Sequence, residues 1–216
     1  MAAANSSIGG VVLAGGGGRR FGGPKAAVVV GGSTLVSRAV QMLAERCRDV
    51  VVVSREGVEF PPLAGARVVL DRPGPDAPLV AVATGLAALD SDVCVVLACD
   101  LPFAGPVVDR LLAAPSGPVV AVDRMGRPQP LCGRYPRVAT LAVCDRLLAA
   151  GRVAMGALLD EILPGTIATG GDELLNVNTP ADAARAEAVA AMRRRALPPR
   201  RCSPGPGSRD RGPRGG

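Results

Sequence analysis

The feature that most constrains the fold is an uninterrupted apolar run, VCVVLAC, at residues 93–99. A strand with one face in water alternates apolar and polar residues, whereas this run has no polar side to present to solvent. Such a strand is typical of the middle of a parallel sheet, where helices cover both of its faces. The run therefore predicts a central strand in a parallel sheet.

Other strand-length runs alternate with helical patterns along the chain. The apolar spacing predicts strands at 8–13, 50–53, 68–70 and 118–122, and helices at 35–44 (capped by Ser33), 79–89, 105–114, 137–149 and 180–195. This order predicts an α/β fold with a single doubly wound, mostly parallel sheet and right-handed crossovers. Ligands of such sheets bind outside the carboxyl ends of the strands.

Length and composition predict one globular domain without a membrane span. The chain has 216 residues, of which 48% are hydrophobic, and it contains no long apolar run free of glycine and charge. The first ten residues lack the basic and apolar regions of a signal peptide, so we expect a cytoplasmic protein. The six cysteines form no C-x-x-C pair and are expected to be reduced thiols.

The basic character of the chain is concentrated at one end. The net charge is +6, but residues 193–216 alone hold eight Arg and one Asp, so the preceding residues carry about as many acids as bases. We therefore expect a folded domain at 1–192, followed by a disordered Pro/Gly/Arg-rich tail at 193–216. The tail is interpreted as a solvated extension, with weak binding to polyanions as the alternative.

The chain contains no histidine, which restricts the chemistry available to it. The commonest general base, Ser-His-Asp and Cys-His arrangements, and histidine metal ligands are all excluded. Any reaction must therefore depend on carboxylates, Lys, Arg, backbone amides and a hard metal ion.

A glycine-rich segment, LAGGGGRRFGGPKA at 13–26, follows the first expected strand. It is not a Walker A loop, because Lys25 is followed by Ala26 in place of Ser or Thr. It is not a dinucleotide fingerprint either, since Arg20 or Phe21 falls where the last glycine is needed. Glycine amides and neighbouring cations favour binding of a polyphosphate, with a purely structural loop as the alternative.

Two aspartates follow expected strands. Asp100 comes directly after the central apolar run, where a carboxylate beside a polyphosphate would suit Mg²⁺; the alternative is an N-cap of the next helix. Asp71 follows the strand at 68–70, but the Pro-rich segment after it also fits a turn-forming aspartate.

Four segments together resemble one family. The glycine segment is similar to the signature loop of nucleotidyltransferases, and ACDLPF at 98–103 resembles the metal-binding motif of the molybdenum cofactor guanylyltransferases, which are MobA-like NTP transferases. GRPQPLCGRYP (126–136) and NVNTPADAARA (176–186) resemble segments that line the pterin side of their cleft. The likeness extends from about residue 8 to residue 190 and implies a Rossmann-like nucleotidyltransferase fold.

The resemblance also implies a reaction and its participants. The terminal phosphate of molybdenum-bound molybdopterin would attack the α-phosphate of GTP, giving the guanine dinucleotide cofactor and pyrophosphate. Mg²⁺ would be the metal, and molybdoenzymes or other proteins of cofactor biosynthesis would be partners. No membrane and no specific nucleic acid are expected as partners. An anionic phosphate nucleophile needs no strong base, which suits a chain without histidine.

The resemblance assigns roles to particular residues. Arg20, Lys25 and Asp100 would be catalytic, with Asp100 as the metal ligand. The nucleotide and cofactor would be bound by Leu13, Ala14, Gly15, Gly16, Gly17, Gly18, Lys25, Asp71, Asp100, Asn176 and Asn178. Asn176 and Asn178 would face the pterin, although both also fit a turn before a helix capped by Thr179, with Pro180 as its first residue.

The sequence departs from the family pattern at three places. Pro24 stands where the aspartate before the lysine is usual, and Val53 or Ser54 stands where an asparagine is usual. The family's Gly-Pro-Leu-Ala-Gly turn around the base is represented by residues 77–81, APLVA, so both glycines are lost. The base selected is therefore open, and alternatives are a cytidylyltransferase, another nucleotidyltransferase of a small-molecule phosphate, or a non-catalytic relative that binds the cofactor.

Overall fold

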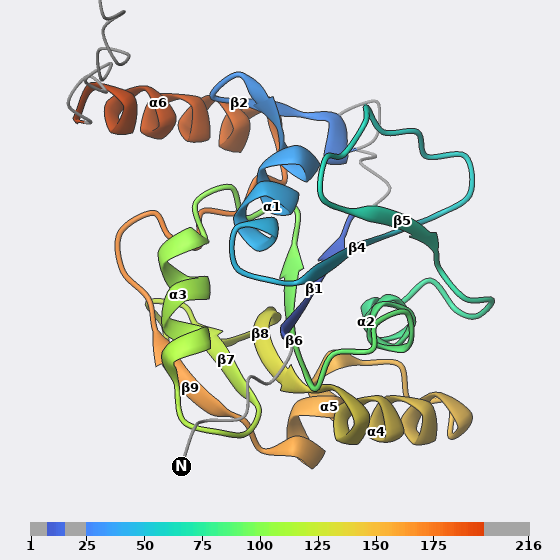
Figure 1. Cartoon of the computed structure of the whole chain (residues 1–216). Helices are drawn as coiled ribbons and strands as arrows, with labels where there is room; N and C mark the ends of the chain where they lie inside the picture. The colour runs from blue at the N-terminus through green and yellow to red at the C-terminus, as the bar shows by residue number, and fades with distance from the viewer. Residues whose placement is uncertain (1–7, 16–24, 197–216) are drawn as a thin grey trace, which may run out of the picture.

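The computed structural model describes residues 8–15 and 25–196, which form a seven-stranded sheet with helices on both faces (Figure 1). The strand order is β5-β4-β1-β6-β8-β7-β9. Neighbouring strands are parallel except at β8, which runs antiparallel to both β6 and β7. The expected α/β fold with a doubly wound, mostly parallel sheet is confirmed.

The parallel half of the sheet consists of strands that the apolar runs predict. They are β1 (Ile8–Leu13), β4 (Asp49–Ser54), β5 (Arg67–Leu70) and β6 (Val93–Ala98). Strand β6 pairs with β1 on one side and β8 on the other, and Val95, Val96 and Leu97 are fully buried. The predicted central position of this apolar run is therefore confirmed.

The other half contains elements that the sequence analysis missed. Strand β8 (Pro128–Pro136) lies in the sheet between β6 and β7 (Val119–Val122), and β9 (Gly165–Ala168) forms the edge. Proline donates no backbone hydrogen bond, so the prolines of this segment argue against a central strand. The pairing of β7 with β8 shifts between Val120 and Ala121, so an irregularity interrupts the ladder in this part of the sheet.

Helices cover the two faces of the sheet and fill two separate cores. Helices α1 (Leu35–Ala44) and α3 (Gly105–Ala113) pack on one face, whereas α2 (Pro78–Ala87), α4 (Arg137–Ala149) and α5 (Met155–Ile162) pack on the other. Adjacent strand residues point to opposite faces, so Val12 enters the first core and Val11 the second. Helix α5 is a further element that the sequence analysis did not predict.

The N-terminus of α1 differs by one residue from the expectation. Thr34, not Ser33, is the N-cap, because its extended backbone lets its hydroxyl oxygen accept a hydrogen bond from the Ser37 N–H at 3.2 Å. Ser33 lies in the short strand β3 (Ser33–Thr34), which pairs with β2 (Val29–Val30).

Helix α6 (Pro180–Ala196) lies apart from the two main cores. It packs with the β2-β3 hairpin, Phe103 and the segment before the helix, which together form a third apolar cluster. The helix begins as expected, because the Thr179 hydroxyl accepts from the Asp182 N–H at 3.2 Å and Pro180 is its first residue. Residues 193–196 of the predicted tail are helical, and the rest of that tail lies outside the described residues.

Two further expectations concern thiols and membranes. Cys47, Cys94, Cys99, Cys132 and Cys144 are free thiols, as predicted, and Cys202 lies outside the described residues. Among the helices that the structure describes, none is both long and apolar enough to span a membrane.

Gly85 allows α2 to approach the sheet closely. A Cβ atom at this position would stand 2.3 Å from Val11 Cγ1 and 3.1 Å from Val53 Cγ2. Both valines are short, fully packed side chains that cannot swing aside. The absence of a side chain at Gly85 therefore lets the last turn of α2 pack directly against β1 and β4.

We predict that Gly85→Ala lowers the free energy of unfolding by about 1–3 kcal/mol, because the added methyl group overpacks the core. The matched control is Gly156→Ala in α5, where an added Cβ would meet no atom within 4 Å. That change should be neutral or stabilising by up to about 1 kcal/mol through helix propensity. Urea unfolding of both variants measures the difference, and equal stability would contradict the packing argument.

Candidate functional site

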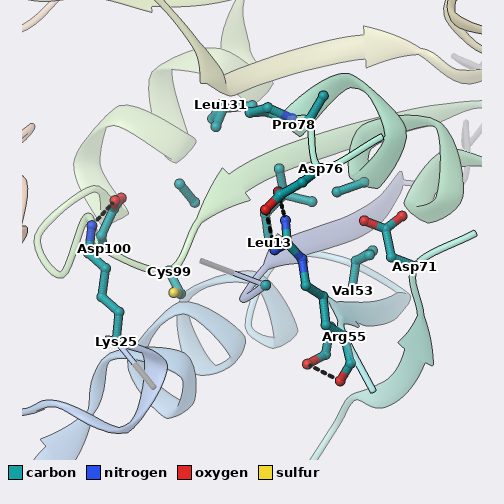
Figure 2. A pocket seen from close by; sticks show the side chains of 15 residues that line it. Leu13, Lys25, Val53, Arg55, Asp71, Asp76, Pro78, Cys99, Asp100 and Leu131 are labelled. Carbon is teal, nitrogen blue, oxygen red and sulfur yellow. Dashed lines mark hydrogen bonds and ion pairs between the residues drawn. The ribbon is translucent and has the colours of Figure 1, made fainter. Parts of the chain in front are cut away.

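A cavity of about 220 Å³ opens where the parallel strands end (Figure 2). Its charged residues gather at two ends. Lys25 and Asp100 lie at one end, whereas Arg55, Asp71 and Asp76 lie at the other. Apolar side chains also line the cavity, from Leu13, Val53, Pro78, Ala81 and Leu131. The cavity is therefore suited to a ligand that meets charged groups at both of its ends.

The first end is built around Lys25. Its Nζ atom lies 2.6 Å from Asp100 Oδ2 and also donates a hydrogen bond to Asn178 Oδ1. The side chains of Lys25 and Asp100 are only 14% and 19% exposed. Residues separated by 75 and 153 positions in the sequence thus converge on one ammonium group. Three of the predicted site residues are brought together here.

Asp100 is held by the segment before α6 and is not a helix cap. It lies two residues after the end of β6, and its backbone carbonyl accepts from the Val177 N–H at 3.0 Å. The preceding residue is fixed as well, because Cys99 N donates to the Leu13 carbonyl at 3.1 Å. The N-cap of α3 is Ala104, so the alternative interpretation of Asp100 as the cap of this helix is wrong.

Asn178 is positioned by the first turn of α6. The Asp182 carboxylate accepts hydrogen bonds from the Asn178 N–H at 3.0 Å and the Thr179 N–H at 2.8 Å. The Thr179 hydroxyl also donates to this carboxylate and is the largest cause of its lowered pKa, and the two backbone N–H groups lower the pKa of Asp182 further. Asn176 lies two residues earlier and lines another cavity, together with Asp123, Arg124 and Arg185. Of the two asparagines, Asn178 therefore contacts Lys25, whereas Asn176 lies at the other cavity.

Residues at the end of β1 also line the cavity. Ala14 N donates to the Val53 carbonyl at 3.0 Å, and Leu13 and Gly15 line the cavity. Gly16, Gly17, Gly18 and Arg20 lie outside the described residues, so their predicted roles stay predictions.

Asp71 lies at the second end of the cavity. Its backbone N–H donates to the Ser54 carbonyl at 2.7 Å, which continues the pairing of β4 with β5. Its carboxylate accepts a hydrogen bond from Thr84 Oγ1 at 2.7 Å, which ties the end of β5 to α2. The carboxylate is thus held in the cavity by the neighbouring helix.

Sequence reasoning missed the ion pair between Arg55 and Asp76. The Arg55 guanidinium forms two hydrogen bonds with the Asp76 carboxylate, one of them at 2.7 Å, and both residues line the cavity. The partners are 21 residues apart, one after β4 and the other just before α2. The sequence offered one signal for this pair. Arg55 directly follows an expected strand, and Asp76 directly precedes residues 77–81, which represent the base turn of the resembled family.

Two alanines and one cysteine in the wall of the cavity are relevant to base selection and to the chemistry of the site. Ala77 and Ala81 line the cavity with their methyl groups, at the positions where the resembled family has glycines. Cys99 also lines the cavity, but burial and the nearby Asp100 carboxylate raise the pKa of its thiol to about 12. A neutral thiol of this kind is a poor nucleophile, so the chemistry of the site does not depend on cysteine.

The geometry can now be compared with known proteins. The family described as the MobA-like NTP transferase domain matches residues 10–162. A probable molybdenum cofactor guanylyltransferase from Chloroflexus aggregans is 33% identical over 171 residues, which cover 70% of this chain and 78% of the relative.

Solved structures show the same fold. Molybdopterin-guanine dinucleotide biosynthesis protein A from Archaeoglobus fulgidus has a TM-score of 0.68 at 22% identity, over 85% of this chain and 99% of that one. The 2-C-methyl-D-erythritol 4-phosphate cytidylyltransferase from Thermus thermophilus has a TM-score of 0.68 at 20% identity, over 87% and 100%. The structures share the architecture, and the sequence matches cover most of the chain. The chain therefore belongs to the MobA-like NTP transferase family.

Proposed function

We propose that this chain transfers the GMP portion of GTP to molybdenum-bound molybdopterin and releases pyrophosphate. The observation that carries the proposal is the convergence of Lys25, Asp100 and Asn178 at one end of a cavity that Gly15 also lines. The named Chloroflexus relative supports the choice of reaction. Molybdoenzymes or other proteins of cofactor biosynthesis would receive the product.

The charges of the cavity fit a nucleoside triphosphate. Lys25 would contact the phosphates at the first end, so that the sugar and base extend along Leu13 and Val53 toward the second end. In the reaction the bond between the α-phosphorus and the oxygen bridging to the β-phosphate breaks. A bond from an acceptor phosphate oxygen to the α-phosphorus forms, and the electron pair leaves with pyrophosphate. Lys25 stabilises the negative charge on the phosphate oxygens.

Mg²⁺ is the proposed metal, and the donor set fits it. Mg²⁺ is commonly held by one or two carboxylates together with substrate phosphates, and does not need an all-protein cage. Asp100 supplies one carboxylate at the cavity, and no cluster of three or more acidic or Cys side chains that could hold a metal occurs within residues 8–15 and 25–196. Asp100 would therefore hold the ion, which would neutralise charge on the phosphates when bound.

Asn178 is proposed to meet the acceptor. Its carboxamide oxygen accepts from the same ammonium group that would bind the nucleotide. A side chain in this position is able to align an acceptor phosphate next to the triphosphate, and alignment is a large part of catalysis when the nucleophile is already charged.

The second end of the cavity is proposed to select the base. A carboxylate can accept from both N1–H and the 2-amino group of guanine, and Asp76 keeps free lone pairs while it accepts from Arg55. Asp76 would read this edge of the base, and Arg55 would position the carboxylate. Ala77 and Ala81 line the cavity where the resembled family has glycines, and the added methyl groups leave less room for a purine, which favours a cytidylyltransferase as the second candidate.

We predict that Asp100→Asn lowers turnover by at least about 100-fold with Mg²⁺, since the charged ligand is lost while the shape is kept. Asp109→Asn is the matched control, because Asp109 pairs with Arg46 outside the cavity. Steady-state pyrophosphate release measures turnover, and thermal unfolding checks that both variants fold. Near-normal turnover of Asp100→Asn would remove Asp100 from the metal site.

Lys25→Ala should weaken GTP binding by about tenfold or more, the loss expected for a charge-assisted hydrogen bond to phosphate. Calorimetry with Mg²⁺ and GTP measures this affinity. Guanosine lacks phosphates, so its weak binding should change little in the same variant. Equal GTP affinity in wild type and Lys25→Ala would contradict the placement of the triphosphate.

Asp76→Asn should reduce the preference for GTP over inosine triphosphate, which lacks the 2-amino group, by about tenfold. Calorimetric titration of both nucleotides gives the ratio, and Asp145→Asn, which breaks an ion pair outside the cavity, should leave it unchanged. An unchanged ratio in Asp76→Asn would remove Asp76 from base selection. A wild-type preference for CTP would instead assign the chain to cytidylyl transfer.

A further inference from the structure

A second cavity lies beside the C-terminal end of α6, near the β2-β3 hairpin. It has a volume of about 340 Å³ and is bordered by α1, the segment before α3 and the last turns of α6. Its charged lining residues are Arg38, Arg193 and Arg194, and among the described residues no acidic side chain lines it. None of these arginines lines the cavity that contains Lys25 and Asp100.

The arginines converge on Phe103 and on the Gly31 turn. The Cζ atoms of Arg38 and Arg193 lie 5.7 and 4.5 Å from the centre of the Phe103 ring. The Nη1 atoms of Arg38 and Arg194 lie 3.2 and 3.0 Å from the point where a Cβ on Gly31 would stand. The guanidinium groups of Arg38 and Arg194 are therefore close neighbours, although like charges repel each other.

The carboxylate nearest to this cluster is already engaged. Glu187 accepts from the Gly31 N–H at 2.5 Å and from Arg194 Nη2 at 3.2 Å. These two contacts lower its pKa, so the group is anionic and contributes one negative charge beside three guanidinium groups. Net positive charge therefore remains at the cavity.

Arg38 also has an unsatisfied donor. One of its Nη atoms donates to the Val30 carbonyl at 3.2 Å, but its buried Nε atom has no hydrogen-bond partner within residues 8–15 and 25–196. Burial is the largest cause of a lowered pKa of this guanidinium, and Arg193 and Arg194 lower it further. A buried N–H without a partner is costly, so the charge of this guanidinium is incompletely compensated beside the cavity, and a nearby anion would stabilise it.

We propose that this second cavity is a binding site for a small phosphate-bearing anion. Guanidinium groups match the oxygens of phosphate with paired N–H donors, and the contacts of Arg38 and Arg193 with the Phe103 ring keep these two groups beside the cavity. The cavity is large enough for inorganic phosphate or pyrophosphate.

An anion bound here would also join two segments. Arg193 and Arg194 belong to α6, whereas Arg38 belongs to α1 and Phe103 follows Asp100 by three residues. Bridging them would stabilise the packing of α6, because a ligand that binds the folded form raises its stability.

The test is titration of inorganic phosphate into the full chain, followed by the Nε–Hε signals of arginine in two-dimensional NMR spectra. We expect a saturable shift of the Arg38 signal, which is identified by its loss in Arg38→Gln. Arg193→Gln and Arg194→Gln should each weaken binding by about tenfold. Pyrophosphate, titrated in parallel, should shift the same Arg38 signal. Comparison of the two dissociation constants then shows which of the two anions the site binds more tightly.

Two controls separate a built site from general attraction to basic residues. Arg195→Gln removes the same charge one residue further along α6, outside the cavity lining, and should leave phosphate affinity unchanged. Lys25→Ala should also leave it unchanged, which separates this site from the proposed nucleotide site. An equal loss in Arg195→Gln and Arg193→Gln, or the absence of saturation, would overturn the proposal.

Discussion

The sheet and the cavity at its edge depend on the burial of both faces of β1 and β6. Their side chains are taken up by two helical layers, so neither strand can present a polar group to solvent along its length. Polar groups can appear only where the strands end, and three segments that follow strands meet there. This constraint gathers Gly15, Arg55 and Asp100 at one edge of the sheet. The cavity is thus a direct result of how the core is packed.

Lys25 shows how such an edge becomes a site. Its ammonium group forms contacts with a carboxylate after β6 and a carboxamide before α6, and both partners are held by backbone hydrogen bonds. An ammonium that balances a partly buried carboxylate keeps the site neutral before a ligand arrives. Under the proposed function, the phosphates and the metal ion would exchange partners with charges that are already in place.

The sequence was informative where one local pattern determines the structure. Strands at 8–13, 50–53 and 93–99 are continuous apolar runs, and Asp100 follows the last of them, so their roles in the fold are readable without any partner. Strand β8 was not predictable in this way, because its prolines are typical of a loop. Its strand conformation depends on pairing with β6 and β7. The Arg55–Asp76 pair was not predictable either, since its partners meet only after α2 has docked on the sheet.

Helix α6 has an apolar contact surface of its own, separate from the two cores of the sheet. A 17-residue helix is about 25 Å long, so it links Asn178 at its start with the arginine cluster near its end as one stiff body. Units with their own small core can detach while the remainder of a protein stays folded. Detachment of α6 would remove Asn178 from Lys25 but leave Arg55, Asp71 and Asp76 in place. Under the proposed function, the molecule would then keep the end of the cavity proposed to bind the base, whereas the end that contains Lys25 and Asp100 would lose the side chain proposed to meet the acceptor.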